Sequence, residues 1–427
     1  MASPTPDSQH DVIIIGGGPS GSTAAIVLAR AGLSVLVVER QQFPRFHIGE
    51  SLLPKNMELF RLLGLEEKLR SIPHTKKYGV ELALGHETTS SLFSFEDCLG
   101  PSESMALNVE RAAFDTLLLN EAESAGATVL RRSAVREVLN LADDDVRVTI
   151  DDREVRARYL VDASGQATYL GKRLGIRHVQ PDLKKVSYFG HFANVFRHPG
   201  KQEGYPAIVM MEDGWFWIIP IDATRTSVGL VMKHAQAKAM DRNPAEMLEG
   251  AISRCPVMTE RMTNSTPVGP CHAIADFSYR CEPYAGEGYF LVGDAATFVD
   301  PVFSTGVCMG MMSAWRAAED LLSILCHGSD PERARRGYIK YIRGSSSVLF
   351  RFVRNFYRHS FREVVLCEVG PLDVHRAVLS ILAGNVFPKP RFRLVWRLWM
   401  FEAIHRIQRY LPAAPKRERV PLFPSTP

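Results

Sequence analysis

Residues 11–40 read DVIIIGGGPSGSTAAIVLARAGLSVLVVER, and this stretch decides the fold. Its β-branched beginning predicts a buried parallel strand over 11–17. The alanine- and leucine-rich middle predicts a helix over 22–32, and the last residues predict a second strand over 34–40. A strand, a glycine-rich turn, a helix and a second strand form the βαβ unit of a Rossmann-type nucleotide-binding fold.

The turn between the first strand and the helix fits the spacing G-x-G-x-x-G. Gly16 allows the tight turn, Gly18 lets the backbone approach a pyrophosphate, and Gly21 lets the helix pack closely on the strand. Pro19 and Ser20 stand at the beginning of the helix, where unpaired N–H groups and the positive dipole end attract phosphates. All five residues are therefore expected in a cofactor site.

An acidic residue completes this nucleotide pattern. Glu39 ends the second strand, about twenty residues after the glycines, where a carboxylate accepts hydrogen bonds from ribose hydroxyls. Arg40 follows it and is expected beside the same cofactor. An ordinary glycine turn would explain the glycines alone, but it leaves the strand, the helix and the acid unexplained.

Length and composition set the class of protein. A chain of 427 residues can hold two or three structural units. It has no apolar run of 18 residues, and its first ten residues lack the layout of a signal peptide. The seven cysteines are scattered without C-x-x-C spacing. We therefore expect a cytoplasmic protein without a membrane span, a structural metal or a nucleic-acid partner.

Charge is distributed unevenly along the chain. Residues 331–427 contain 19 Lys/Arg and six Asp/Glu, a net charge of +13 within a total of +4, so the first 330 residues carry −9. A basic C-terminal region suits an acidic partner. A solvated helical surface explains the same composition equally well.

Further segments extend the nucleotide site. The strand predicted over 288–294 ends at Asp294 and is followed by a helix predicted over 305–326. In flavoproteins of this layout such an aspartate binds the ribityl chain, and the helix N-terminus faces the flavin ring. Residues 162–165 suit close packing against the cofactor, and Arg111, at the start of a helix, can reach its phosphates or ring. These segments together indicate FAD, and the single glycine fingerprint indicates that no NAD(P)H domain is built in.

These elements predict an α/β fold in three parts. A Rossmann-type FAD-binding domain is discontinuous in sequence, a β-rich substrate domain is inserted into it, and a helical C-terminal region follows. The expected bounds are 1–75, 105–180 and 276–330 for the FAD-binding domain, 76–104 and 181–275 for the substrate domain, and 331–427 for the C-terminal region.

Two motifs make the interpretation specific. Residues 214–220 read GWFWIIP and fit W-x-W-x-I-P, and residues 298–306 read FVDPVFSTG and fit F-x-x-P-x-x-S-x-G. With Gly49-Glu50-Ser51 and the FAD motif, these residues resemble the flavin-dependent halogenases of the phenol and pyrrole type. The resemblance covers about residues 10–330 and implies the fold of FAD-dependent monooxygenases similar to p-hydroxybenzoate hydroxylase.

The resemblance implies an enzyme of natural product biosynthesis that uses FADH2. A separate NAD(P)H-dependent flavin reductase supplies the reduced cofactor, and O2 converts it to a flavin hydroperoxide. Chloride or bromide attacks this species, and the resulting hypohalous acid travels to a lysine beside the aromatic substrate. Lys77-Tyr78-Gly79 fits the family pattern for that lysine, which we expect at the start of a strand, and Lys76 is the second candidate.

The resemblance also assigns the remaining site residues. Trp215 and Trp217 alternate on one strand, face the same way, and are expected to separate the flavin from the substrate. Ser304 joins the catalytic set, and Thr305 and Gly306 are expected to bind the halide at a helix N-terminus. The cofactor set is completed by Ser51 and Pro301.

One position departs from the tryptophan halogenases. Those enzymes carry a glutamate immediately before Ser-Thr-Gly, and this chain has Phe303 there, in the expected substrate pocket. Phenol and pyrrole rings are richer in electrons than the indole ring of tryptophan, which needs the help of this glutamate. The expected substrate is therefore a small phenol or pyrrole, either free or bound to an acyl or peptidyl carrier protein, which would match the basic C-terminal region.

Two other functions remain open at this point. A flavin monooxygenase or a geranylgeranyl-reductase-like oxidoreductase would share the FAD segments but should lack the tryptophan pair and the Lys77 pattern. A non-catalytic FAD-binding protein would share all of these segments. An exposed or misplaced Lys77 would favour that last interpretation.

Overall fold

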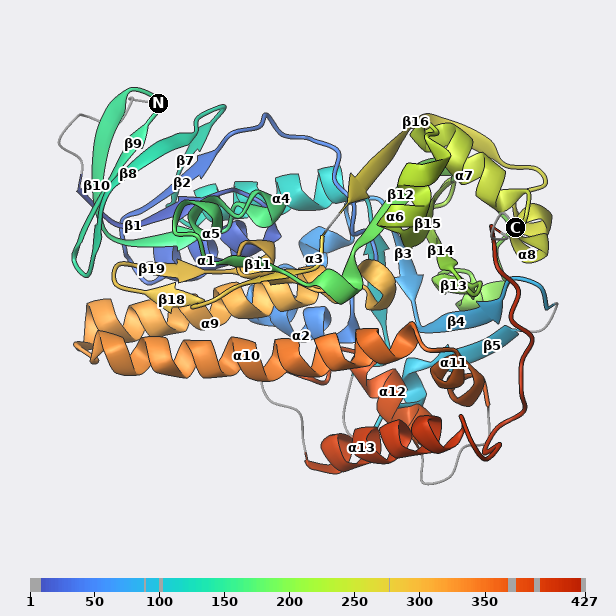
Figure 1. Ribbon diagram of the computed structural model, residues 1–427. Coiled ribbons are helices and arrows are strands. Elements are labelled where there is room, and N and C mark those ends of the chain that lie inside the picture. The colour runs from blue at the N-terminus through green and yellow to red at the C-terminus, as the bar shows by residue number, and fades with distance from the viewer. Residues whose placement is uncertain are drawn as a thin grey trace.

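The computed structural model describes residues 9–87, 90–99, 103–275, 277–367, 374–387 and 392–423. It contains two large sheets, two small sheets and a helical layer made by the C-terminal part of the chain (Figure 1). This is the mixed α/β architecture that the sequence predicts, with helices in the C-terminal region.

The first sheet holds the predicted βαβ unit. Strand β1 pairs in parallel with β2 on one side and β10 on the other, and β19 continues the sheet beyond β10. Helix α1 connects β1 to β2 and packs against α4 and α9. The strands are β1 (Gln9–Ile15), β2 (Val35–Glu39), β7 (Thr128–Arg131), β8 (Val135–Ala142), β9 (Asp145–Ile150), β10 (Arg153–Asp162), β18 (Ala285–Gly286) and β19 (Tyr289–Leu291), and the helices are α1 (Pro19–Arg30) and α4 (Arg111–Ser124).

The second large sheet has seven strands in the order β16-β12-β15-β14-β13-β4-β5. All neighbours in it are antiparallel except β13 and β4. Helices α6 and α7 pack on its far face over a separate apolar core. The elements are β4 (Gly79–Leu84), β5 (Ser90–Ser94), β12 (Lys185–Ala193), β13 (Ala207–Met210), β14 (Gly214–Pro220), β15 (Arg225–Lys233), β16 (Thr266–Ala275), α6 (His234–Met240), α7 (Pro244–Ile252) and α8 (Pro256–Arg261).

Small elements connect the two large sheets. A two-stranded ribbon pairs β3 with β6, and a three-stranded sheet has the order β11-β17-β20. These elements are β3 (His74–Lys77), β6 (Ala106–Val109), β11 (Arg177–Val179), β17 (Tyr279–Cys281), β20 (Thr297–Phe298), α2 (Pro54–Leu62), α3 (Glu66–Leu69) and α5 (Tyr169–Arg173). The 3-10 turns are Phe95–Asp97, Gly165–Ala167, Pro181–Leu183, Gly200–Gln202, Gly293–Ala295 and Pro301–Phe303.

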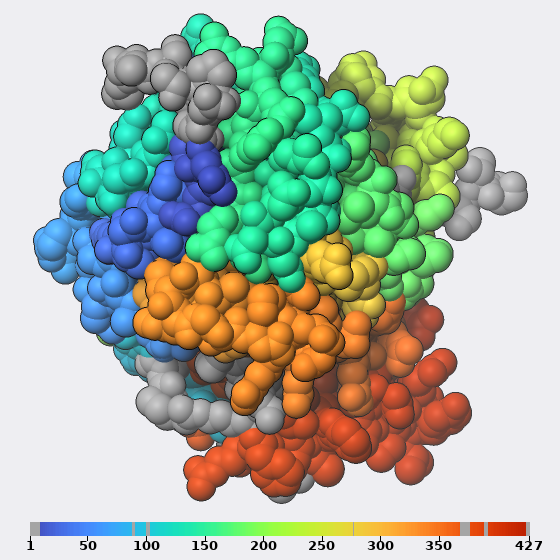
Figure 2. All heavy atoms as spheres, turned by 90° about the vertical axis from the view of Figure 1, so that its left-hand side faces the viewer, coloured from blue at the N-terminus to red at the C-terminus, as the bar shows by residue number. Residues whose placement is uncertain are grey.

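The C-terminal helices form a layer of their own. Helix α9 (Gly306–His327) packs on α1, and α10 (Pro331–Phe356) returns antiparallel to it (Figure 1). The helices α11 (His359–Val365), α12 (Val374–Leu382) and α13 (Phe392–Ile407) follow. Figure 2 shows the orange α9–α10 segment from the left-hand end of Figure 1, with the red C-terminal part beneath it. In the part of the chain that the structure describes, no helix is long and apolar enough to cross a membrane.

Two details differ from the sequence-based expectation. Helix α1 begins at Pro19 rather than at residue 22, because proline is well suited to the first helical position and Gly18 stands before it in an extended conformation. The segment around Lys77 forms two strands, β3 and β4, which are divided at Tyr78. Lys77 therefore ends a strand of the ribbon, although the family pattern would place it at the start of a strand.

Candidate active site

A single cavity of about 530 Å³ runs between the first sheet, the second sheet and the beginning of α9. Most of the residues expected from the sequence line it, from the glycine turn to the second sheet. They are Gly16, Gly18, Pro19, Ser20, Glu39, Arg40, Ser51, Lys77, Arg111, Trp215, Trp217, Asp294, Pro301, Phe303, Ser304 and Gly306. Gly21 and Thr305 do not line the cavity, and both are buried beside residues that do.

The glycine turn is held by close backbone packing. A β-carbon on Gly21 would lie 1.9 Å from the carbonyl oxygen of Gly16, so only glycine fits there. Gly18 has an open side, because the nearest atom to a β-carbon placed there would be 3.5 Å away, on Arg45. The turn is therefore closed against the protein and open to the cavity, which suits an approaching pyrophosphate.

Glu39 anchors the turn from the next strand. The N–H of Gly17 donates to one carboxylate oxygen at 2.8 Å, and the N–H of Gln41 donates to the other at 2.7 Å. Each carboxylate oxygen can accept a second hydrogen bond. The side chain is buried on the cavity wall, so the remaining acceptor positions suit ribose hydroxyls.

Two arginines share one carboxylate behind the turn. Arg111 makes a two-point contact with Asp115 at 2.8 and 2.9 Å, and Arg45 lies 3.1 Å from the same carboxylate. All three side chains are almost completely buried, and burial lowers the pKa of Arg45. Two cations against one anion leave positive charge on the cavity wall, which suits a diphosphate.

Asp294 places a further carboxyl group on the cavity wall. Burial raises the pKa of its carboxyl to about 7, against the opposing influence of Arg111. No described residue donates a hydrogen bond to this carboxylate, so its acceptors are available to a ligand rich in hydroxyls. The glycine turn, Glu39, the arginine pair and this carboxylate together fit a dinucleotide such as FAD, since each matches one of its chemical groups.

Lys77 is the buried amine of the site. Its side chain is 3 % exposed, and Nζ donates hydrogen bonds of 3.0 Å to Ser51 Oγ and 3.0 Å to the carbonyl oxygen of Leu52. The nitrogen also lies 5.3 Å from the centre of the Phe95 ring. Among the described residues no carboxylate forms an ion pair with it, and burial lowers its pKa to about 7. Lys76, in contrast, is exposed to solvent.

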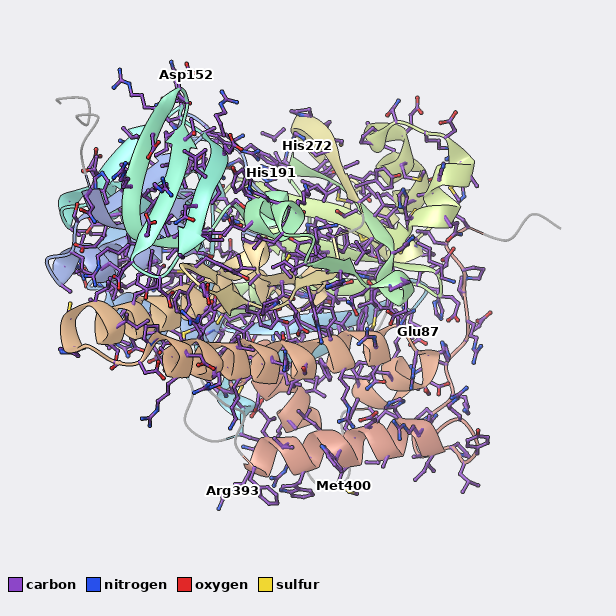
Figure 3. All side chains as sticks on the ribbon, turned by 60° about the vertical axis from the view of Figure 1, so that its left-hand side comes forward. Glu87, Asp152, His191, His272, Arg393 and Met400 are labelled. Carbon is purple, nitrogen blue, oxygen red and sulfur yellow. The ribbon has the colours of Figure 1, made fainter. Side chains whose placement is uncertain are left out.

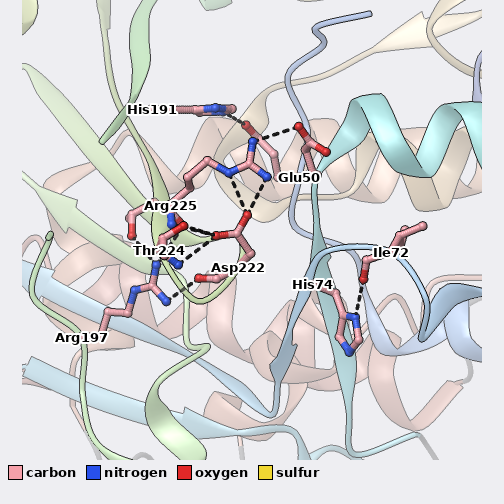
Figure 4. Close-up of polar contacts among 10 residues, drawn as sticks. Glu50, Ile72, His74, His191, Arg197, Asp222, Thr224 and Arg225 are labelled. Atoms are coloured by element: carbon pink, nitrogen blue, oxygen red, sulfur yellow. Dashed lines mark hydrogen bonds and ion pairs between the residues drawn. The ribbon is translucent and has the colours of Figure 1, made fainter. Parts of the chain in front are cut away.

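The loop before Ser51 is held by the polar contact between His191 and Glu50. His191 Nε2 lies 3.1 Å from the buried Glu50 carboxylate, as Figure 4 shows. Figure 4 also shows Arg225, which joins Asp222 to Glu110, the residue before α4. Strands β12 and β15 of the second sheet are thereby tied to the loop before Ser51 and to the start of α4.

Trp215 and Trp217 form the wall contributed by the second sheet. Both side chains point into the cavity, and their ring centres lie 6.0 Å apart. The Trp217 indole lies over Gly229 on the neighbouring strand, where a β-carbon would be 2.2 Å from the ring. Its N–H donates to Ser227 Oγ at 3.1 Å. Strand β15 therefore provides both the space and the hydrogen bond that fix this ring.

The Trp215 ring is fixed by the C-terminal region. Its indole N–H donates to the Tyr357 hydroxyl at 3.1 Å, and that hydroxyl donates to Asp300 Oδ2 at 2.8 Å. Asp300 also accepts the N–H of Val302 at 3.0 Å and so caps the turn that leads to α9. Burial raises the pKa of Asp300 to about 6. The two sequence motifs are thus joined through Tyr357.

The turn at the start of α9 closes this end of the cavity. Ser304 has a left-handed backbone (φ 54°) and lines the cavity with Gly306, whereas the Thr305 side chain is buried behind them. The 22 residues of α9 place a positive dipole end and unpaired N–H groups here. Phe303 is buried, and its ring lies 4.8 Å from that of Phe352. The turn therefore places helix N–H groups, which suit an anion, beside an aromatic wall.

Comparisons with known proteins agree with this geometry. Residues 9–333 match the model of the FAD binding domain family. The chain is 33% identical over 388 residues to a 1H-pyrrole-2-carbonyl-[peptidyl-carrier protein] brominase of Pseudoalteromonas luteoviolacea, with 89% of this chain and 93% of that protein covered. It is 30% identical over 417 residues to the corresponding chlorinase of Pseudomonas fluorescens, covering 91% and 92%. This chain belongs to the flavin-dependent halogenases.

Solved structures place the halogenase in the same group. The flavin-dependent brominase Bmp2 superimposes with a TM-score of 0.82 at 28% identity, covering 93% of this chain and 100% of that one. The myxobacterial chondrochloren halogenase CndH gives a TM-score of 0.78 at 30% identity, covering 94% and 96%. The halogenase is therefore an FAD-binding enzyme, as its sequence motifs indicate.

Several wall residues lay outside the sequence-based expectation. Arg45 and His47 belong to the loop before Ser51. Two polar residues in a loop that leads to an expected cofactor residue could have indicated that they line the site. Burial lowers the pKa of His47 to about 4. Leu382 on the wall, and Tyr357, which bonds Trp215 without lining the cavity, come from the C-terminal region.

Proposed function

We propose that this halogenase uses FADH2, O2 and chloride or bromide to halogenate an electron-rich aromatic ring, a phenol or a pyrrole, at Lys77. The buried amine carries the proposal. It stands on the wall of the cavity that holds the FAD-binding features, and burial brings its pKa to about 7. A solvated surface lysine, the alternative for a lysine found by spacing alone, would have neither property.

Each group of the site has a role in this proposal. The glycine turn, Glu39, Arg111 and Asp294 hold the cofactor, which supplies the oxidising equivalents with O2. Gly306 and the backbone at Ser304 and Thr305 hold the halide at the N-terminus of α9. A separate NAD(P)H-dependent flavin reductase supplies the reduced cofactor, consistent with the single nucleotide fingerprint.

Lys77 then acts on hypohalous acid. Two bonds of its nitrogen are directed to Ser51 and Leu52, which leaves one position. That position carries an N–H in the ammonium form and a lone pair in the amine form, and a pKa near 7 populates both forms at neutral pH. The ammonium donates a hydrogen bond to the hypohalous oxygen, while the ring carbon takes the halogen and loses a proton, releasing water.

The pocket around this amine suits a small neutral ring. Apolar side chains such as Val80, Phe95 and Ile208 line the cavity with Lys77, and Phe303 stands where the tryptophan halogenases have a glutamate. Without that carboxylate, the site depends on the ring's own electrons, as pyrrole and phenol rings allow. Two relatives are named for pyrrole-2-carbonyl bound to a peptidyl carrier protein, which supports a carrier-bound pyrrole as the first substrate to test.

The test is a halogenation assay read by mass spectrometry. Purified protein receives FAD, a flavin reductase, NADH, chloride or bromide, and a panel of free phenols, free pyrroles and carrier-bound pyrrole-2-carbonyl. Lys77→Ala should abolish halogen incorporation while FAD still binds, and Lys76→Ala, a neighbouring lysine on the exposed side, should retain it. Hydroxylated product, or activity that survives in Lys77→Ala, would contradict the proposal.

A further inference from the structure

The outer face of α13 is unusually apolar for a surface helix. Large apolar side chains there are widely exposed: Phe392 at 80 %, Trp399 at 63 %, Ile407 at 49 %, Tyr410 at 84 % and Leu411 at 68 %. They are five of the twelve large apolar residues that stand out as exposed in the described chain. Such a concentration within 20 residues marks an interaction surface rather than scattered surface residues.

Three of these side chains belong to α13 itself, which ends at Ile407, and share one side of it. Phe392, Trp399 and Ile407 recur at helical spacing, so they follow one line along it. The opposite side is buried against the protein through Leu394, Phe401 and His405. In Figure 3 the labelled Arg393 and Met400 lie on the side of α13 that points away from the rest of the molecule. We call this outer surface, with residues 409–411 that follow the helix, the α13 face.

Positive charge borders the α13 face. Arg393, Arg406 and Arg409 are exposed along it. Between residues 392 and 413 the sequence has one acidic residue, Glu402, which is buried and pairs with Arg406 and Arg351. The face therefore offers aromatic and aliphatic contacts with arginines and no exposed acid, which selects an acidic partner.

The position of α13 connects this face to the active site. Helix α13 packs directly on α12, and Leu382 at the end of α12 lines the cavity. A helix is about 10 Å across, so the two helices separate the surface from the cavity by about 20 Å. A partner on this face is thus close to the pocket that contains Lys77.

We propose that the α13 face is the docking surface for an acidic carrier protein that presents the aromatic substrate as a thioester. This inference rests on the proposed function, since it assigns a partner to the same site. A second copy of this chain fits poorly, because a twofold contact would bring the arginines of one face against those of the other. An anionic membrane would match the charge, but it would give no reason for the helix to lie over the substrate pocket.

The experiment measures binding separately from chemistry. A dye-labelled peptidyl carrier protein loaded with pyrrole-2-carbonyl is titrated with the FAD-bound protein, and the dissociation constant is read by fluorescence anisotropy at 50 and 300 mM salt. The test variant is Arg393→Glu with Arg409→Glu. The matched control is Arg333→Glu with Arg336→Glu, which makes the same charge change on exposed arginines at the start of α10.

We expect at least a tenfold weaker affinity for the test variant, a change of less than twofold for the control, and weaker binding at high salt. Halogenation of a free pyrrole-2-carbonyl pantetheine thioester should be unaffected by both variants. If no substrate is halogenated but the affinity loss is confined to the test variant, the proposed chemistry fails and the docking surface stands. The inference would be overturned if the unmodified protein did not bind the carrier, or if both variants lost affinity equally. It would also be overturned if the test variant kept its affinity for the carrier and lost only its binding to phosphatidylcholine–phosphatidylglycerol vesicles, measured in parallel.

Discussion

The Tyr357 hydroxyl donates a 2.8 Å hydrogen bond to the Asp300 carboxylate. Tyr357 follows the last turn of α10, whereas Asp300 begins the turn that leads to α9. Through the same hydroxyl, the C-terminal region also accepts the N–H of Trp215. The helical layer therefore helps to position both halogenase motifs, in addition to covering them.

Tyr357→Phe should destabilise the protein by about 2 kcal/mol at pH 8, because it removes a hydrogen bond to a buried carboxylate. The Asp300 pKa, already raised to about 6 by burial, should rise further in the variant. A folded-state pKa above the unfolded value costs stability as pH rises through that window. The loss should thus be larger at pH 8 than at pH 5.5 in urea unfolding. Tyr410→Phe, on an exposed side chain, is the control, and a loss independent of pH would contradict the role of Asp300.

Lys77→Met should stabilise the folded protein at pH 7 by on the order of 2 kcal/mol, because it removes a buried amine that has no ionic partner. The Lys77 pKa, near 7 in the folded state, lies below its ordinary value of 10.5, so the unmodified protein gains stability as pH rises between these two values. The advantage of the variant should therefore shrink toward pH 10 in denaturant unfolding. Lys76→Met should show no such trend, and a constant difference for Lys77→Met would refute the burial argument.

Two substitutions in the glycine turn separate folding from binding. Gly21→Ala would force a β-carbon to within 1.9 Å of Gly16 oxygen, so we expect a loss of about 3 kcal/mol in unfolding free energy. Gly18→Ala meets only Arg45 at 3.5 Å and should fold normally. It should nevertheless weaken FAD binding at least tenfold, measured by quenching of flavin fluorescence, because the methyl group enters the cavity. Normal FAD binding by Gly18→Ala would exclude a close approach of cofactor and turn.

Asp115→Asn should destabilise the protein by about 3–5 kcal/mol, because it removes the one carboxylate with which the buried Arg45 and Arg111 both pair. Denaturant unfolding without FAD provides the measurement. Asp145→Asn, which disturbs the exposed contact with Arg147, should cost less than about 1 kcal/mol. Equal effects of the two substitutions would show that the buried arginine pair is compensated elsewhere.

The sequence predicted the nucleotide-binding half well because its signals are local. The glycine turn, the flanking strands and Glu39 follow one another closely in the sequence, and Gly16 and Gly21 are required by their own backbone surroundings. The division of β3 from β4 at Tyr78 was harder to predict from the sequence, because the two strands pair with strands from different parts of the chain. Where the FAD-binding and substrate domains begin and end stays a prediction.

The site was only partly accessible from sequence. Spacing favoured Lys77 but kept Lys76 open, because adjacent residues of a strand face opposite sides and only the packed structure shows which side is buried. Tyr357 could not be predicted, because it meets Trp215 across 142 residues of sequence. The roles assigned to Ser304 and Gly306 stay predictions.

The ribbon of β3 and β6 carries the Lys77 amine separately from the glycine turn and from the tryptophan wall. Lys77 stands at the end of a two-stranded element that belongs to neither large sheet. A small change in the residues that pack around this ribbon can therefore shift the amine along the pocket while both sheets stay in place. We expect regiochemistry, the choice of ring carbon that receives the halogen, to be adjusted in this ribbon, where variation between otherwise similar enzymes would alter the product pattern and spare cofactor affinity.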